Sequence, residues 1–573
     1  MNTIQQKLVS LRNRARHIQA SLRRWSLYCD EVSGEMKEDL LVRFTPAEQA
    51  AFPNDLELTR TRLKSVATQL KTLSRWYDYV LEQTNDQLDR ARTMLDQGRP
   101  HDALAIINDA ELRTVLPNED TFGFVFQVLR QHTSHELHQK LVTIDAIMRD
   151  LYLPTVKLAH QRGLVSKECL SRTPLAYLAD VPEGRVPWQH HVQHGMNLGR
   201  QIPVSLVTIP RRLIGQPWSI VAVAHDVGRC VYHDLNISWE IAGKLQTESV
   251  SGGVRPQAAV LWAQWHETLF ADVFATLKLG PAYVSGMIET LGSDPVAAVT
   301  IQANSPVPPA YIRWHVMLQT LTLMNLGEPA RELFSQVHLL CGDPNRLAMQ
   351  LGSSWLAFVT ETRAVAGLIA LSPCQKLGGG RIVDFVQPIA AVEMSTSGKV
   401  KDVLLAGDET CSTDHDFHWV ETLQHIPTPA HIGLAGLRLA FDATAEFETS
   451  RRLCVRFWCM MQYLMGSTEP QREREDREFA PPDAVLKQIA QNAVPAMTAG
   501  HAYAPGGAMP FGAPAMVAVG PNGLPVPMAA IGNMPMSVMA GVSNSGGRIP
   551  GSPISGYSIP GSSMPGPMTP GAQ

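Results

Sequence analysis

Apolar residues recur at alternating steps of four and three along the N-terminus, and this spacing is the strongest constraint that the sequence places on the fold. The first stripe comprises Ile4, Leu8, Leu11, Ala15, Ile18, Leu22 and Trp25. A second stripe comprises Leu63, Val66, Leu70, Leu73, Tyr77 and Val80. Such steps place apolar side chains on one side of a helix, as in coiled coils. Because Pro46 and Pro53 interrupt the pattern between the stripes, we expect two long helices packed as an antiparallel hairpin.

Changes in pattern divide the chain into four regions, and the expected fold is mainly helical with an α+β core. Residues 1–180 carry the helical, coiled-coil-like pattern. Residues 181–375 follow a Pro- and Gly-containing boundary and form the expected core. Residues 376–470 mix strand-like runs such as IVDFVQPIAAVEM with helical ones. Residues 471–573 form a charged linker and then a Gly/Pro/Met-rich tail, which we expect to be disordered because it buries too little apolar surface.

Composition excludes some classes of partner and compartment. The chain has 573 residues, a formal net charge of −4 and 18% charged residues, with no clustered excess of Lys and Arg. This argues against binding to nucleic acid or to an acidic membrane surface. No run reaches the ~20 apolar residues that a membrane-spanning helix needs. The N-terminus has no apolar core of a secretory signal, and the eight cysteines form no C-x-x-C pair. We therefore expect a cytoplasmic protein with protein partners.

Two segments carry the residues with potential chemistry. The first reads P-W-S-I-V-A-V-A-H-D-V-G-R from Pro217 to Arg229, after a β-branched run at Ile202–Ile209 that we expect to be a strand. The second reads W-H-E-T-L-F-A-D-V-F from Trp265 to Phe274, within a helix expected from about Val260 to Leu277. A helix that starts at Pro217 and a stop at Gly280–Pro281 complete the expected layout.

Together these segments resemble a group of bacterial zincin-like (gluzincin-type) metallopeptidases over about Pro203 to Tyr283. The motif of that group runs roughly P-W-x-x-x-A-L-A-H-E-V-G-H and E-I-F-A-D-x-F-G. The resemblance implies a zincin-like core in which H-E-x-x-H supplies two zinc ligands and a general base. It also implies that a later E-x-x-A-D helix supplies the third ligand.

The zinc-binding chemistry of this motif is degenerate here. His225 matches the first ligand, and Asp226 replaces the catalytic Glu with a shorter carboxylate. Arg229 stands at the second ligand and has no lone pair to give a metal ion. The third-ligand position holds Thr268, while Glu267 lies one residue off that helix face and Asp272 ends the motif. We expect Arg229 to form an ion pair with Asp226, Asp272 or Glu267, and we expect no cofactor, with zinc as the alternative.

Three functions follow as hypotheses. The first is a non-catalytic zincin-like protein, a pseudopeptidase that acts as a binding or scaffold module. The second is an atypical metallohydrolase that uses His225, Glu267 and Asp272 as ligands with Asp226 as the base. The third is a structural or assembly protein that forms a homo-oligomer through its N-terminal helices.

Overall fold

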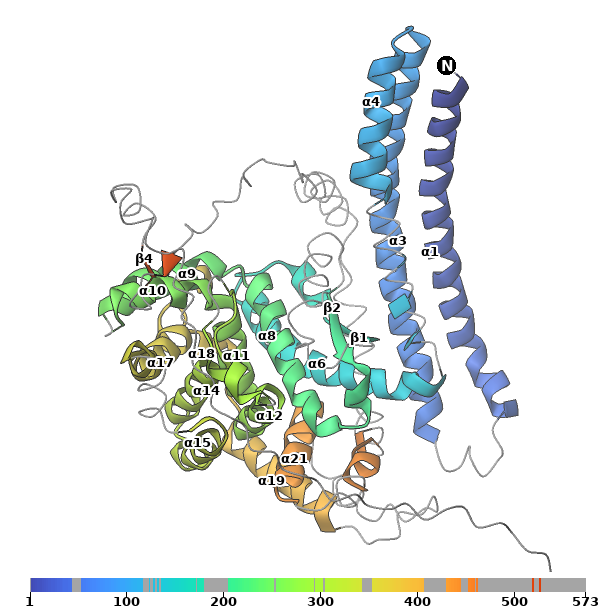
Figure 1. Cartoon of the computed structure of the whole chain (residues 1–573). Helices are drawn as coiled ribbons and strands as arrows, with labels where there is room; N and C mark the ends of the chain where they lie inside the picture. The colour runs from blue at the N-terminus through green and yellow to red at the C-terminus, as the bar shows by residue number, and fades with distance from the viewer. Residues whose placement is uncertain are drawn as a thin grey trace, which may run out of the picture.

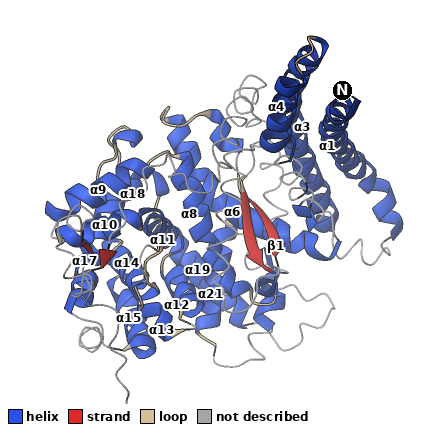
Figure 2. Ribbon diagram, turned by 45° about the horizontal axis from the view of Figure 1, so that its top comes forward, coloured by secondary structure: helices blue, strands red, loops and turns tan. Residues whose placement is uncertain are grey.

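The computed structural model is mainly helical, with little strand structure (Figures 1 and 2). It describes residues 2–43, 53–116, 123, 127–128, 131–132, 135–171, 173–179, 205–251, 254–292, 294–301, 305–342, 353–406, 429–444, 452–458, 460–461, 518–519 and 525–526. The expected tail therefore lies outside the described residues, apart from two short strands, β3 (Ala518–Val519) and β4 (Pro525–Val526). None of the helices in the described ranges is both long and apolar enough to cross a membrane.

The N-terminal arm is built from two long helices and a shorter one (Figure 1). They are α1 (Asn2–Arg43), α3 (Pro53–Asp96) and α4 (Pro100–Ala110), which continues into a π-helical turn, η1 (Glu111–Val115). Helices α1 and α3 pack along each other. Arg12 pairs with Asp89, at 2.5 Å, and Arg23 pairs with Asp78, at 3.2 Å. Because the partner number falls as the α1 number rises, the two helices run antiparallel.

The apolar stripes predicted from the sequence form the core of this arm. The described side chains of both stripes that are buried there are Leu8, Leu11, Ala15, Ile18, Leu22, Leu73, Tyr77 and Val80. The side chains of Trp25, Leu63, Val66 and Leu70 lie outside those the structure describes. Burial of one stripe against the other stabilises the hairpin through the hydrophobic effect. The apolar stripe of α1 is thus buried by contacts within the same chain.

A two-stranded parallel sheet lies between the arm and the main body (Figure 2). It pairs β1 (Leu175–Ala179) with β2 (Leu206–Pro210), with Leu175 opposite Leu206. Side chains alternate between the faces of a strand. Leu175, Tyr177 and Leu206 join the core of the arm, whereas Ala176, Leu178, Val207 and Ile209 join the core of the main body. Both faces of this sheet are therefore covered, each by a different core.

Helices make up the main body. They are α6 (His135–Gln161), η2 (Lys167–Ser171), η3 (Arg211–Ile214), η4 (Pro217–Ala222), α8 (Val223–Asp234), α9 (Ser238–Ser251), α10 (Pro256–Gln264) and α11 (His266–Leu279). The remainder are α12 (Pro281–Leu291), α13 (Pro295–Val299), α14 (Ala310–Leu323), α15 (Gly327–Cys341), α17 (Ser353–Leu371), η5 (Gln375–Leu377), α18 (Ile382–Val386), α19 (Ala391–Ala406) and α21 (Ala430–Asp442). The predicted mainly helical class is confirmed. A two-stranded sheet beside helices does not by itself establish the zincin-like α+β core.

Helices α8 and α11 pack closely at a glycine. A Cβ placed on Gly228 would lie 3.0 Å from the Cα of Ala271 and 3.0 Å from a ring carbon of Phe274. Only a residue without a side chain allows this approach of two helix backbones. The two helices run antiparallel at this contact, so that His225 in the first turn of α8 faces Asp272, and Arg229 faces Glu267 in the first turn of α11.

Two sequence predictions were wrong in detail. The helix expected from Val260 to Leu277 is interrupted at Trp265, where α10 ends and α11 begins. The Trp265 side chain is buried there, and its indole N–H donates to the Ser305 carbonyl at 3.0 Å. The strand-like run that starts at Ile382 forms the helices α18 and α19. Helix α18 is started by a local capping box, in which the backbone N–H of Arg381 donates to Asp384 at 3.0 Å.

Helix α11 ends where the sequence predicted. Gly280 adopts a positive φ of 57° and ends the helix, and Pro281 begins α12 at its first position. The expected strand at Ile202–Ile209 is present as β2, which begins at Leu206. Residues 202–204 lie outside the described part of the chain.

Candidate functional site

The segment that connects β2 to α8 places His225 and Asp226 in the interior of the main body. Strand β2 leads through the short helices η3 and η4 into α8, and Pro217 starts η4. Every residue from Pro217 to Gly228 is buried. His225 and Asp226 therefore lie in the first turn of a helix that is enclosed by the core rather than on an open surface.

His225 and Asp272 lie in direct contact. The Nδ1 atom of His225 lies 2.9 Å from Oδ1 of Asp272, on the facing helix α11. The hydroxyl of Tyr283, on α12, donates to the same oxygen at 2.8 Å. Asp272 has no exposed surface and His225 is 7% exposed. The carboxylate therefore orients the imidazole ring from within the core.

A third charged residue, Arg313 from α14, completes this cluster. Its Nε lies 2.7 Å from Oδ2 of Asp272 and its Nη2 lies 2.8 Å from Oδ1. The same Nη2 lies 3.3 Å from Nδ1 of His225. A guanidinium held by both oxygens of one carboxylate is the geometry in which arginine binds most strongly. The sequence prediction missed Arg313. A single arginine in the mostly apolar run Tyr311–Leu318, which also holds His315, was a signal that it would be buried with a partner.

The proton on His225 can be assigned from these contacts. The carboxylate of Asp272 only accepts hydrogen bonds and is the nearer neighbour of Nδ1, at 2.9 Å against 3.3 Å for Nη2 of Arg313, which therefore does not donate to Nδ1. The proton therefore lies on Nδ1 and is donated to Asp272, which leaves a lone pair on Nε2. Burial lowers the pKa of His225; the charge of Asp272 opposes this shift, and Arg313 and Arg229 add to it. The ring is accordingly neutral at pH 7.

Asp272 stays ionised although it is fully buried. Burial alone would raise its pKa, but the charge and hydrogen bonds of Arg313, together with His225, hold the pKa of Asp272 far below its usual range. The buried cluster thus contains one carboxylate and one guanidinium and is electrically balanced.

Asp226 has the opposite environment. It has no exposed surface, and neither of its carboxyl oxygens has a hydrogen-bond partner among the residues that the structure describes. Burial raises the pKa of Asp226 to about 7, although the charges of Arg229 and Arg313 oppose the shift. Both arginines are bound to other carboxylates. Asp226 is therefore a buried acid whose carboxyl group is partly protonated at neutral pH.

Arg229 forms its ion pair with Glu267, one of the three acids that the sequence suggested. Its Nε and Nη2 lie 2.7 and 2.6 Å from Oε1 of Glu267. Nε2 of His233 lies 3.2 Å from the same oxygen. Burial would raise the pKa of Glu267, but the hydrogen bond with His233 and the charge of Arg229 lower it to about 2. These three side chains are partly exposed, and we call them the rim of the site.

The side chains at this place fit a zinc ion poorly. A catalytic zinc needs three protein ligands, usually imidazoles and carboxylates. Of the positions that supply the ligands in the motif, only His225 offers an uncommitted lone pair, because Asp272 is bound to Arg313, and the nearby Glu267 is bound to Arg229. Thr268 is buried and brings no charge to the site. Among the described residues, no group of three or more His, Cys, Asp or Glu side chains is arranged to hold a metal ion.

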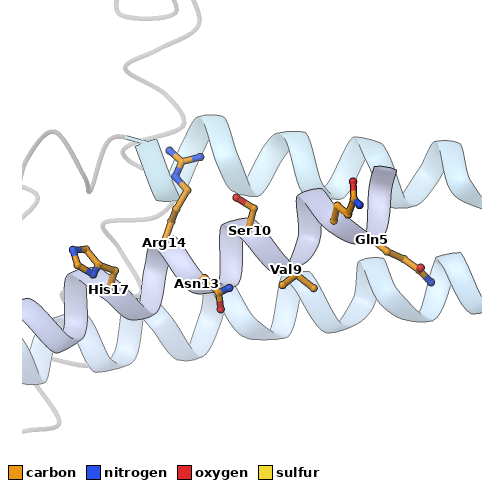
Figure 3. Close-up of a pocket in the computed structure, with 7 residues that line it drawn as sticks. Gln5, Val9, Ser10, Asn13, Arg14 and His17 are labelled. Atoms are coloured by element: carbon orange, nitrogen blue, oxygen red, sulfur yellow. The ribbon is translucent and has the colours of Figure 1, made fainter. Parts of the chain in front are cut away.

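A groove of about 820 Å³ lies elsewhere, on the arm (Figure 3). It is lined by one face of α1, namely Gln5, Gln6, Val9, Ser10, Asn13, Arg14 and His17. Arg14 already pairs with Glu111 at 3.1 Å. This polar, open face has none of the buried charge of the His225 cluster, so the cluster is the better candidate for a functional site.

Comparison of the chain with protein-family models, with curated proteins and with solved structures found no match.

Proposed function

We propose that this protein is a non-catalytic zincin-like module, a pseudopeptidase that binds or organises protein partners. One observation carries the proposal. The guanidinium of Arg313 is bound to Asp272 and lies 3.3 Å from the ring of His225. A fixed positive charge beside the only remaining ligand repels a divalent cation, and the charge of Asp272 is already compensated.

The general base of a peptidase has no counterpart in this arrangement. A base must reach the water that it activates, directly or through one hydrogen bond. Asp226 is fully enclosed, and neither of its carboxyl oxygens forms a hydrogen bond with a described residue. In contrast, the rim formed by Arg229, Glu267 and His233 reaches the surface, with 14%, 28% and 21% of the side chains exposed. Partner contacts at this site would be made by the rim.

The atypical metallohydrolase remains a second candidate because of one contact. A metal-binding histidine usually donates its other ring N–H to a carboxylate, and His225 donates Nδ1–H to Asp272. The Nε2 atom keeps the lone pair that a metal would take. This contact is also what a zincin-like ancestor that lost its other ligands would retain.

Metal content distinguishes the two candidates. Purified wild-type protein and His225→Ala are measured by inductively coupled plasma mass spectrometry after dialysis against zinc. The proposal requires no stoichiometric zinc in either protein. About one zinc per chain that disappears in His225→Ala would replace it with the metallohydrolase, which would then be tested for peptide cleavage. The binding role is tested by capture of partners with wild type and with Arg229→Gln, which removes the rim ion pair.

A further inference from the structure

Lys244 and Cys374 form a buried pair of an amine and a thiol, to which the proposed function gives no role. The Nζ atom of Lys244, on α9, lies 3.6 Å from the Sγ atom of Cys374 and donates to it. Lys244 is 8% exposed, and Cys374 has no exposed surface. The two residues are 130 positions apart in the sequence, so the fold, and not local spacing, brings the amine to the sulfur.

The contacts around the pair direct the amine nitrogen toward the sulfur. The thiol donates to the carbonyl of Ser372 at 3.7 Å, so the sulfur accepts in its contact with Lys244. The ammonium group of Lys244 also donates to the carbonyl of Pro373 and pairs with Oε1 of Glu240 at 3.3 Å. Its partners therefore include a carboxylate, which can accept a proton from the nitrogen.

Glu240 also holds the turn that carries Cys374. Its two carboxylate oxygens accept the backbone N–H groups of Gln375, at 2.5 Å, and of Lys376, at 3.0 Å. The turn closes on itself, because the N–H of Cys374 donates to the carbonyl of Gly380 at 2.9 Å. Glu240 lies on α9, so the turn is anchored to the same helix that carries the amine.

The sulfur lies close to the surface although it is covered. Pro373 and Gln375, on either side of Cys374, are exposed, and so is Gly379 in the same turn. A small oxidant such as hydrogen peroxide therefore has only a short distance to travel to the sulfur. The thiolate is the form of cysteine that peroxides oxidise, and the ammonium group of Lys244 stabilises it once the thiol proton has left.

We propose that Lys244 and Cys374 form a reversible covalent cross-link, a sulfenamide, when the protein meets hydrogen peroxide. Peroxide first oxidises the thiol by two electrons, so that R–SH and H2O2 give R–SOH and H2O. Glu240 accepts a proton from the ammonium group, and the nitrogen lone pair then attacks the sulfur. The S–N bond forms as the S–O bond breaks, so that R–SOH and R′–NH3⁺ give R–S–NH–R′, H2O and H⁺.

The cross-link is reversible, and it protects the cysteine. Two thiols reduce it, so that R–S–NH–R′ and two R″–SH give R–SH, R′–NH2 and R″–S–S–R″. Because the amine is already in contact with the sulfur, condensation competes with further oxidation to the irreversible sulfinic acid. Cys169 offers a comparison within the chain. It is also buried, but its sulfur lies beside the hydroxyl of Ser166 and the carbonyl of Asp234, and neither group forms such a bond.

Peptide mass spectrometry of the full-length protein after treatment with hydrogen peroxide tests the proposal. After digestion without a reductant, we expect the peptides that contain Lys244 and Cys374 to be joined, with a mass two hydrogen atoms below their sum. Dithiothreitol should separate them again, and Cys169 should form no link to a lysine. Cys374 that stays unmodified, or that reaches the sulfinic or sulfonic acid without any joined peptide, would overturn the proposal.

A conservative variant separates the chemistry from the packing. Lys244→Arg keeps the positive charge beside Glu240 and the sulfur, but a guanidinium stays protonated and does not attack sulfur. The link should be absent from this variant, and dimedone, which traps sulfenic acids, should label Cys374 several-fold more than in wild type. Lys376→Arg is the matched control, since it changes an exposed lysine in the same turn and should leave the link intact. Equal labelling of Cys374 in wild type and in Lys244→Arg would contradict the proposal.

Discussion

Arg313 and Asp272 form a two-point ion pair in the core, with Nε 2.7 Å from Oδ2 and Nη2 2.8 Å from Oδ1. The pair joins α14 to α11, and His225 attaches α8 to the same carboxylate. The buried negative charge of Asp272 is therefore balanced by one cation, the guanidinium of Arg313. Breaking a buried pair from one side is costly because the remaining charge is left in a medium that solvates it poorly.

Arg313→Met should destabilise the protein by about 3–5 kcal/mol, since it leaves Asp272 buried without a counter-charge. Urea unfolding followed by circular dichroism measures the change. Arg381→Met is the control, because Arg381 pairs with Asp384 at the surface, where ion pairs contribute little. Equal effects of the two substitutions would show that the buried pair is not needed for stability.

Asp226→Asn should change how stability depends on pH. The pKa of Asp226 is raised in the folded chain, from 3.8 to about 7. The folded state therefore binds this proton more tightly than the unfolded state, and stability is lost as the pH rises from about 4 to about 7. Asparagine does not titrate, so the Asp226→Asn variant does not lose this stability as the pH rises. Its stability relative to wild type should improve by up to roughly 4 kcal/mol between pH 4 and pH 8.

Asp384→Asn provides the contrasting case for that measurement. Hydrogen bonds from Arg381 hold the pKa of Asp384 below its usual range, so its contribution is present above about pH 4 and is lost only in stronger acid. Between pH 5 and pH 8 the difference between this variant and wild type should stay constant. If Asp226→Asn behaved in the same way, the carboxyl of Asp226 would not be protonated in the folded chain.

Gly228→Ala should destabilise the protein by about 1–3 kcal/mol, because the new methyl group meets the backbone of Ala271 and cannot be accommodated by a side-chain rotation. Gly243→Ala on α9 is the matched control. Nothing lies within 4 Å of a Cβ at that position, so alanine should stabilise the helix by about 0.5–1 kcal/mol. Thermal unfolding of both variants gives the comparison, and a neutral Gly228→Ala would refute the close helix contact.

Restoring the motif tests the zincin-like geometry directly. The double variant Arg229→His with Thr268→Glu supplies an imidazole and a carboxylate at the two degenerate ligand positions. If the helices are arranged as in a zincin, we expect it to bind about one zinc per chain, measured by calorimetry. Adding His225→Ala to this background should abolish the binding. Failure of the double variant to bind zinc, in a folded protein, would remove support for a zincin-like site.

The sequence predicted those features that depend on local spacing. The stripe from Leu8 to Leu22 follows from the helical spacing of its residues. For Arg229 the spacing left three possible partners, and the structure shows that the partner is Glu267. Arg313 was missed because it lies on a helix outside the motif, and only tertiary packing brings it to Asp272. The interruption at Trp265 and the helix at Ile382 were missed for a related reason. A buried indole contact and a capping interaction outweighed the periodicity and the β-branched composition.

The sheet formed by β1 and β2 has a consequence for how the molecule unfolds. Because Tyr177 belongs to the core of the arm and Leu178 to that of the body, neither core can come apart without exposing part of the other. The β1–β2 sheet is therefore part of both cores. We expect the arm and the body to unfold in a single cooperative step rather than as two independent domains.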